Sequence, residues 1–212
     1  MKPSGLAVHR GWSHDAVTAA DIVRDRIVGA RVFGLHRLDR ATSGVLLFAL
    51  NSATARTLQA SFNSANTRKR YIALVRGPLK EAQILDHPIR TRGGNERVAA
   101  LTEFIPLAHV DRWSLVEARP RTGRLHQIRK HLKHLNCPVI GDVKYGKGDV
   151  NRLFREQFDL HRLALHCCEI SVEHNNEVLK LQAPLPQDLV QPFQSLGILN
   201  ELKNESFSFL FT

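Results

Sequence analysis

One carboxylate stands alone in the sequence HRLDR, residues 36–40, where Asp39 lies between Arg37 and Arg40. From position 26 to position 80 it is the only acidic residue, although that stretch carries many arginines and lysines. A carboxylate among cations can neutralise an arginine in a structural ion pair, or it can act as a nucleophile or a general base. On these residues alone, both interpretations remain open.

A candidate partner for Asp39 is Arg129. The segment RLHQIRKHLKHLN predicts a helix with an apolar face formed by Leu125, Ile128, Leu132 and Leu135. At about 100° per residue, Arg129 falls at the border of this face, so its side chain is predicted to be half-buried. A guanidinium in that position needs a carboxylate, and its planar fork suits bidentate pairing. Because the surrounding region supplies no other acid, the sequence predicts an ion pair between Asp39 and Arg129.

The charge of the chain indicates a polyanionic partner. The 212 residues carry a net charge of +10, and their hydrophobic content of 43% is enough for one domain with its own core, predicted to span residues 1–212. A second acid-free stretch, residues 118–141, is rich in Arg, Lys and His. Such segregated charge favours a polynucleotide, bound through its phosphates. The residues predicted to bind this nucleic acid are Arg37, Arg40, Arg119, Arg124, His126, Lys130 and Lys133.

Several classes of protein are disfavoured. No apolar run approaches the length of a membrane span, and the amino terminus lacks the apolar core of a signal peptide, so a cytoplasmic protein without membrane association is expected. Three cysteines without a CxxC pair fit reduced thiols, and no metal site and no cofactor are predicted. His131 and His134 lie one helical turn apart, but we expect them to be solvated or to face phosphate rather than to bind metal.

These residues must be positioned by a mixture of helices and strands. Helices are predicted over residues 15–29, with Val17, Ala20, Val23 and Ile27 on one buried stripe and Gly29 as its stop, over 52–65, with Ser52 as cap, and over 125–135. The apolar run GVLLFAL, residues 44–50, predicts a central strand buried on both faces. Further strands are predicted at residues 70–77, 100–108, 113–120 and 163–174. The fold class is therefore α+β, with a mixed, mainly antiparallel sheet flanked by helices.

Three motifs resemble those of a known family. HRLDRATSG with Asp39, KRYIALVRG with Tyr71 and PRTGRLHQIRKHL with Arg129 are similar to the signature motifs of the RluA-type pseudouridine synthases, and KPSGLAVHR resembles their usual amino-terminal stretch. The likeness runs from residue 2 to about residue 190. It implies the pseudouridine synthase catalytic fold with a central RNA-binding cleft, and cofactor-free isomerisation of uridine in RNA to pseudouridine.

The resemblance also implies roles for individual residues. Asp39 would be the essential aspartate, Tyr71 would pack against the target uracil, and Arg37 would help to take the nucleotide out of its stack. The sequence does not separate a nucleophilic Asp39 from one that removes a proton from C2'. Together with Asp39, Tyr71 and Arg129 form the predicted catalytic set.

The predicted substrate follows from closer likenesses. Segments such as IGDVKYG and NRLFREQFDLHRLALH resemble those of family members that act on tRNA, which implies uridine 65 of the T-stem as the target. A uridine of the large ribosomal RNA or another tRNA uridine is the alternative, and an RNA-binding protein or chaperone without turnover is an alternative of another class. The motifs begin almost at residue 1, so we expect no S4-like module and a short amino-terminal edge. We also expect a monomer that needs no protein partner.

Overall fold

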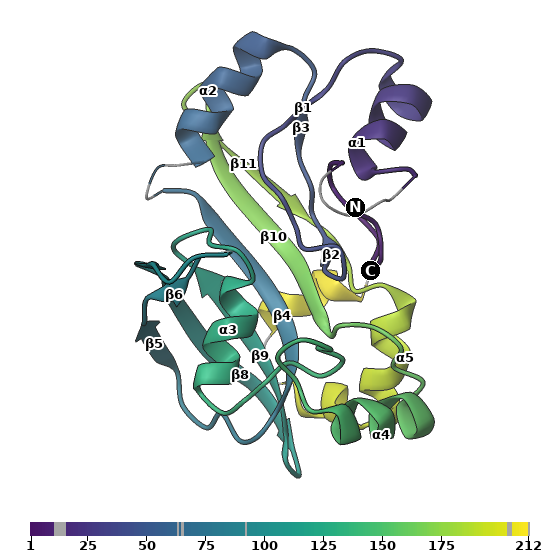
Figure 1. The fold of residues 1–212 in the computed structure, drawn as a ribbon. Helices are drawn as coiled ribbons and strands as arrows, with labels where there is room; N and C mark the ends of the chain where they lie inside the picture. Colours follow the sequence, from purple (N-terminus) through teal and green to yellow (C-terminus); the bar gives the residue numbers. More distant parts are fainter. Residues whose placement is uncertain (11–15, 63, 65, 92, 203–204, 212) are drawn as a thin grey trace.

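The computed structural model describes residues 1–10, 16–62, 64, 66–91, 93–202 and 205–211. In this part of the chain the main feature is a seven-stranded sheet in the order β11-β10-β4-β9-β8-β5, to which β2 adds by pairing with β10 (Figure 1). The β2–β10 pair is parallel, and the other pairs of this sheet are antiparallel. The predicted α+β class with a mixed, mainly antiparallel sheet is confirmed.

The bounds of the elements are as follows. The strands are β1 (Phe33–Gly34), β2 (Ser43–Gly44), β3 (Phe48–Ala49), β4 (Arg68–Arg76), β5 (Gln83–Asp86), β6 (Ile89–Arg90), β7 (Arg97–Val98), β8 (Leu101–Val110), β9 (Trp113–Pro120), β10 (Leu165–His174) and β11 (Glu177–Gln182). The helical segments are α1 (Ala19–Ile22), η1 (Val23–Val28), α2 (Ser52–Phe62), α3 (Gln127–His134), α4 (Gly148–Phe158), α5 (Gln187–Ser195), η2 (Ile198–Glu201) and η3 (Glu205–Leu210).

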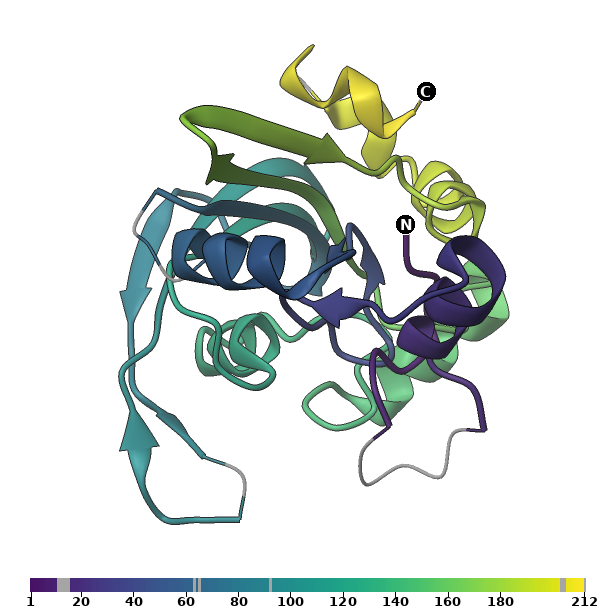
Figure 2. The same ribbon diagram turned by 90° about the horizontal axis from the view of Figure 1, so that it is seen from above.

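The centre of the sheet is covered on both faces. Figure 2 shows α2 and α3 on one side of the sheet and the helical turns after β11 on the other. For this reason the middle of β4, residues 71–75, is a continuous buried run rather than an alternating one. The β6–β7 hairpin stands away from this body (Figure 2). In the described ranges, no helix is both long and apolar enough to cross a membrane.

Four predicted strands are confirmed, and one is wrong. The predictions at 70–77, 100–108, 113–120 and 163–174 correspond to β4, β8, β9 and β10. The run at 44–50 is not a central strand, because the chain leaves the sheet after β2, and β3 pairs with β1 in a separate two-stranded sheet. Gly44 has φ 125°, and a Cβ there would lie 2.1 Å from the carbonyl oxygen of Cys167. The backbone turns away at this glycine, and Leu50 is left exposed.

The first predicted helix is only partly right. Its predicted start, Asp15, lies outside the described residues, and the observed helix begins after Thr18, whose hydroxyl and Asp21 form a capping box. Gly29 ends it in the left-handed conformation, as predicted. The predicted buried stripe is wrong, because Val17 precedes the cap and Ile27 lies in a π-helical segment, where the spacing of a regular α-helix no longer applies; both are exposed.

The second predicted helix is observed as α2, which buries Leu58 and Phe62. Its predicted end includes Asn63 and Ala65, which lie outside the described residues. Ser52 is not the cap, because the side chain of Asn51 accepts the hydrogen bond from the amide of Thr54 at 2.8 Å. Both α2 and α3 lie on the same face of the sheet (Figure 2). Residues of both helices line a cleft together with Tyr71, and this cleft is the candidate active site.

Candidate active site

A cleft of about 600 Å³ opens between α2, α3 and the sheet. Asp39, Tyr71 and Arg129 all line it, together with Arg37, Arg124 and His126. The structure thus brings together Asp39 and Arg129, which are 90 positions apart in the chain. All three residues of the predicted catalytic set lie in this one cleft.

The turn that carries Asp39 is held by the amino-terminal segment. The ammonium of Lys2 is buried and donates to the carbonyl oxygens of Pro3, Leu6 and Arg40 at 2.8, 2.8 and 3.0 Å. Burial lowers the pKa of Lys2 to about 8. From the sequence, this stretch is notable only for its likeness to the family; in the structure its lysine bonds the residue that follows Asp39.

Arg129 joins two carboxylates rather than one. Its Nη1 donates to Oδ2 of Asp39 at 3.0 Å, so the predicted ion pair is present. Its Nε and Nη2 donate to the two oxygens of Asp142 at 2.7 and 2.8 Å. The predicted bidentate partner was wrong, because the fork of the guanidinium faces Asp142 and only its remaining edge faces Asp39. The Arg129 side chain is also more deeply buried than predicted, because α3 packs this face onto the sheet.

Asp142 is the residue that the sequence analysis missed. Its carboxylate is fully buried, and Oδ1 also accepts the amides of Lys144 and Tyr145, both at 2.9 Å. Burial alone raises the pKa of this carboxyl, but the hydrogen bonds from Arg129 and the two amides outweigh burial and lower the pKa below 3.8. The sequence does single out Asp142, because it is the first acidic residue after the acid-free stretch 118–141 and directly follows Gly141. Gly141 has φ 77°, and a Cβ there would meet the carbonyl oxygen of Arg162 at 1.9 Å.

Tyr71 lies in β4, between β9 and β10, where it pairs with Ala118 and Cys167. Its side chain is largely buried yet contributes to the wall of the cleft. Burial raises the pKa of the phenol well above 10, so the hydroxyl remains protonated. The ring of this neutral phenol, fixed in a strand, offers an apolar face in an otherwise basic cleft.

His126 lies on the other side of Asp39. It precedes α3 with φ 55°, which is the left-handed conformation. Its Nε2 is 3.8 Å from Oδ1 of Asp39, and its Nδ1 is 3.1 Å from the hydroxyl oxygen of Tyr145. The guanidinium of Arg129 lies 5.1 Å from the centroid of the Tyr145 ring. These contacts place Asp39 between Arg129 and His126.

Of the other predicted RNA-binding residues, some line the cleft and some lie outside its lining. Arg37 and Arg124 are exposed and line the cleft. Arg40 is exposed and donates to the carbonyl of Gly5 at 2.9 Å. Lys130 donates to the carbonyl of Arg90 at 2.9 Å, so it contacts strand β6 of the hairpin. Lys133 lies outside the cleft lining, with its ammonium 5.9 Å from the Tyr145 ring centroid.

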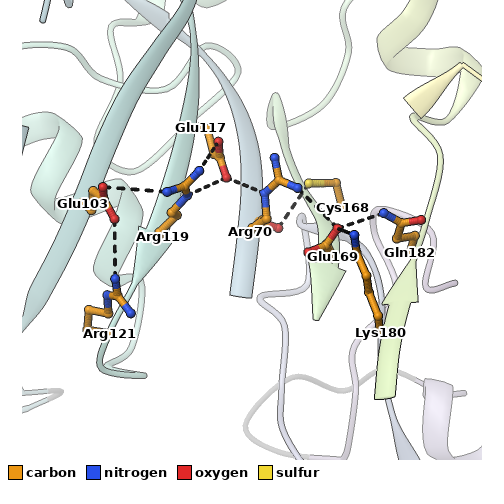
Figure 3. Close-up of polar contacts among 9 residues, drawn as sticks. All are labelled: Arg70, Glu103, Glu117, Arg119, Arg121, Cys168, Glu169, Lys180 and Gln182. Atoms are coloured by element: carbon orange, nitrogen blue, oxygen red, sulfur yellow. Dashed lines mark hydrogen bonds and ion pairs between the residues drawn. The ribbon is translucent and has the colours of Figure 1, made fainter. Parts of the chain in front are cut away.

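Arg119 lies on the face of the sheet opposite the cleft. Residues alternate between the two faces of a strand, and Ala118 lies opposite Tyr71 on the cleft face, so Arg119 points to the other face. There it donates to both oxygens of buried Glu117 at 2.8 and 3.1 Å and lies 3.8 Å from Glu103 (Figure 3). Arg119 is thus part of an ion-pair network on the back of the sheet, away from the cleft.

The predicted surroundings of His131 are wrong. It is fully buried rather than solvated, with Nδ1 2.9 Å from the hydroxyl of Thr102 and Nε2 2.9 Å from the carbonyl oxygen of His87. His134 is exposed, and its ring stacks on that of His87 with centroids 3.9 Å apart. Across the described residues, no group of three or more His, Cys, Asp and Glu is arranged to hold a metal ion.

Comparisons with known proteins agree with this geometry. A family profile described as RNA pseudouridylate synthase matches residues 1–134. The protein named tRNA pseudouridine synthase C of Vibrio cholerae serotype O1 is 41% identical over 196 residues, which cover 82% of this chain and 80% of that protein. The protein of the same name from Salmonella typhimurium is 39% identical over 221 residues, covering 92% and 85%.

Solved structures give the same result. Human RNA Pseudouridylate Synthase Domain Containing 4 has a TM-score of 0.78 at 25% identity, covering 92% of this chain and 88% of that one. Human RNA Pseudouridylate Synthase Domain Containing 1 has a TM-score of 0.69 at 27% identity, covering 93% and 98%. Fold, cleft and carboxylate therefore define an RNA-modifying isomerase. The chain belongs to the RNA pseudouridylate synthase family, as its three motifs predicted, and it is an RNA pseudouridine synthase.

Proposed function

We propose that this enzyme converts one uridine of tRNA, uridine 65 in the T-stem, to pseudouridine, with Asp39 as its catalytic carboxylate. The observation that carries the proposal is the position of Asp39 in the cleft, where Nη1 of Arg129 holds one carboxylate oxygen at 3.0 Å. The relatives named tRNA pseudouridine synthase C support tRNA as the substrate. The exposed Arg37 and Arg124 on the cleft support a phosphate-bearing ligand.

The reaction requires a nucleophile or base and a way to hold the base while it turns. Pseudouridine formation breaks the bond between C1' of the ribose and N1 of uracil and forms a bond from C1' to C5. In this proposal Asp39 either attacks covalently or removes a proton from C2'. The hydrogen bond from Arg129 holds one oxygen of the carboxylate in place, which both routes need.

Other residues in the cleft and around it bind the RNA. Tyr71 packs against the uracil, which must leave its stack to reach a carboxylate at the base of a cleft. Arg37 helps to extrude the nucleotide, while Arg40, Arg124, Lys130 and Lys133 contact phosphates. We further propose that residues 1–212 act as one catalytic domain, a monomer in the cytoplasm without a protein partner.

The test is a comparison of pseudouridine maps of total RNA from cells with and without the gene. We expect one T-stem site in tRNA to lose its modification and a plasmid copy of the gene to restore it. If a ribosomal RNA site lost its pseudouridine instead, the proposed substrate would be wrong and the proposed reaction would still hold.

The same cells test the role of Asp39. A plasmid encoding Asp39→Asn should not restore the site, because the substitution keeps the shape of the side chain and removes the charge that the chemistry needs. Its purified protein should bind the RNA within about tenfold of wild type, since phosphate contacts supply most of the affinity. Restoration by Asp39→Asn would remove Asp39 from the chemistry.

A further inference from the structure

The isomerisation moves two protons as well as a glycosidic bond. Once C5 is joined to C1', it carries both its hydrogen and the sugar, and N1 shares a double bond with C6. When the C5–H bond breaks, its electron pair restores the double bond between C5 and C6, and the pair shifted to N1 takes up a proton. The electrons balance without an oxidant or a reductant. A base is needed near C5 at a stage when Asp39 has already acted on the sugar or the base.

Two groups of the cleft wall are poor proton acceptors. The ring of His36 stacks on Phe62, and its Nε2 accepts the amide of Leu47 at 3.2 Å, so its lone pair is already used. Burial lowers the pKa of His36 to about 4. Tyr71 keeps its proton, because burial raises its pKa well above 10.

Lys69 also lines the cleft, and burial lowers its pKa below the ordinary value, but its ammonium lies over the Phe62 ring, 5.3 Å from the centroid, and among the described residues no ion pair joins it to Asp39. Among the described nitrogen bases that line the cleft, His126 is the one within 4 Å of the Asp39 carboxylate. Its side chain is 22% exposed, similar to the 19% of Asp39, so a substrate that reaches Asp39 also reaches the edge of this imidazole.

Tyr145 can fix the ring of His126 in the form that accepts a proton. A neutral imidazole has one N–H, and the hydroxyl oxygen of Tyr145 lies 3.1 Å from Nδ1. When Nδ1–H donates to that oxygen, Nε2 carries the free lone pair and points toward Oδ1 of Asp39, 3.8 Å away. The imidazolium formed at Nε2 would then lie beside the carboxylate, which stabilises it.

The charges around His126 keep it neutral before the reaction. Burial lowers its pKa below 6.5, Asp39 opposes this by raising it, and the cations Arg129, Lys144 and Lys130 lower it further. These groups come from α3, from the turn at Asp39 and from the turn that follows Asp142. A neutral imidazole near pH 7 is the form that a general base requires.

We propose that His126 is a second catalytic residue, whose Nε2 accepts the proton that leaves C5 of the rearranged uracil, while Tyr145 orients its ring. The proposal rests on the proposed function, in which Asp39 acts earlier in the reaction. The proton on Nε2 returns to solvent, and N1 takes its proton from solvent, so the enzyme ends in its starting state.

The test compares uridine with 5-fluorouridine at the target position of a synthetic T-stem RNA. With fluorine on C5 there is no C5 proton to remove, yet the bond to N1 can still break and the bond to C5 can still form. The variant is His126→Asn, because asparagine tolerates the left-handed conformation of residue 126 and cannot accept a proton at neutral pH. The matched control is His134→Asn, at the other end of the same helix and outside the cleft lining.

The expected result is a split between the two substrates. In single-turnover measurements, His126→Asn should form pseudouridine about 100-fold more slowly than wild type, within the range of a lost general base. It should consume 5-fluorouridine at a rate within about threefold of wild type, and deuterium at C5 of uridine should slow the variant more than the wild type. His134→Asn should match wild type on both substrates.

Other results would overturn the assignment. Equal losses on the two substrates would mean that His126 only positions Asp39 or the RNA, and no loss would mean that it has no role. Tyr145→Phe, which keeps residue 126 and should lose about tenfold on uridine alone, repeats the comparison if His126→Asn is unstable. Asp39→Asn should be inactive on both substrates. If Asp39→Asn stayed active, the proposed function of Asp39 would fail whatever His126 did.

Discussion

Replacing Asp142 by asparagine separates the structural carboxylate of the site from the reactive one. The Asp142 side chain is fully buried and accepts four hydrogen bonds, two from the fork of Arg129 and two from the amides of Lys144 and Tyr145. Asparagine has the same shape but a single acceptor oxygen, and its amide group would face an N–H of Arg129 or a backbone N–H. Whichever way the amide is turned, donors meet donors and the charge of Arg129 loses its main partner.

The size of the loss follows from burial. Removing one partner of a buried ion pair costs about 3–5 kcal/mol, because the other charge is left uncompensated. Arg129 would keep its bond to Asp39, so we expect a loss near the lower limit, about 3 kcal/mol in the free energy of unfolding. A domain of this size has roughly 5–15 kcal/mol in total, so Asp142→Asn should fold but with a clearly lower midpoint.

The comparison variant is Asp39→Asn. Asp39 is 19% exposed and accepts one hydrogen bond from Arg129, which the oxygen of asparagine can still accept. We expect a cost of about 1 kcal/mol or less. Urea unfolding of both variants measures the difference, and single-turnover rates at saturating RNA should show a complete loss for Asp39→Asn and a large loss for Asp142→Asn, whose Arg129 no longer holds Asp39 in place. Equal destabilisation by the two substitutions would refute the division of roles.

The same carboxylate predicts the response to acid. The pKa of Asp142 in the folded protein lies below its ordinary value of 3.8, so its contribution to stability is complete above that value and is lost as the pH falls through the lowered folded pKa. Wild type should therefore lose stability steeply below about pH 4. Asp142→Asn lacks this titration, so its melting temperature should fall less between pH 5 and pH 3 than that of wild type.

Two further predictions concern RNA and metal. Arg124→Ala, on the cleft, should weaken RNA binding modestly and reduce the salt dependence by about one counterion, whereas Arg119→Ala, on the back of the sheet, should leave RNA affinity unchanged and lower stability because buried Glu117 loses a partner. Similar salt slopes for the two variants would contradict the placement of Arg119. Activity on pre-folded RNA should survive EDTA treatment and dialysis, since the isomerisation needs no Lewis acid, and an absolute requirement for a metal would contradict this.

The sequence predicts a strand of the main sheet well where the strand lies at the centre of the sheet and its residues are buried by that position alone. β4 and β10 are central strands with long buried runs, and β9 ends at the predicted residues. Residues 44–50 are equally apolar, but an apolar run does not specify its partner. Here the close approach of Gly44 to Cys167 directs the chain out of the sheet, and that contact depends on strands far away in the sequence.

The surroundings of two residues, Arg119 and His131, could have been predicted from the sequence. In a strand over residues 113–120, Glu117 and Arg119 must share a face, so an internal partner for Arg119 was available two positions away. At about 100° per residue, His131 falls beside Leu135 at the edge of the apolar arc of α3, as Arg129 does at its opposite edge. Border positions of an amphipathic helix on a sheet are buried when the sheet supplies hydrogen bonds, as Thr102 does for His131.

The division of Arg129 between two acids answers the question that Asp39 raises in the sequence. An arginine that needs neutralising and a carboxylate that must react make conflicting demands, because a carboxylate held by a bidentate fork has both oxygens engaged. Asp142 takes the fork and the burial, and among the described residues no hydrogen bond reaches Oδ1 of Asp39. Asp39 is thereby oriented by a single bond and keeps an oxygen available at the cleft, facing His126 at 3.8 Å. The structural use of an acid and its chemical use are both present, on two different residues that share one arginine.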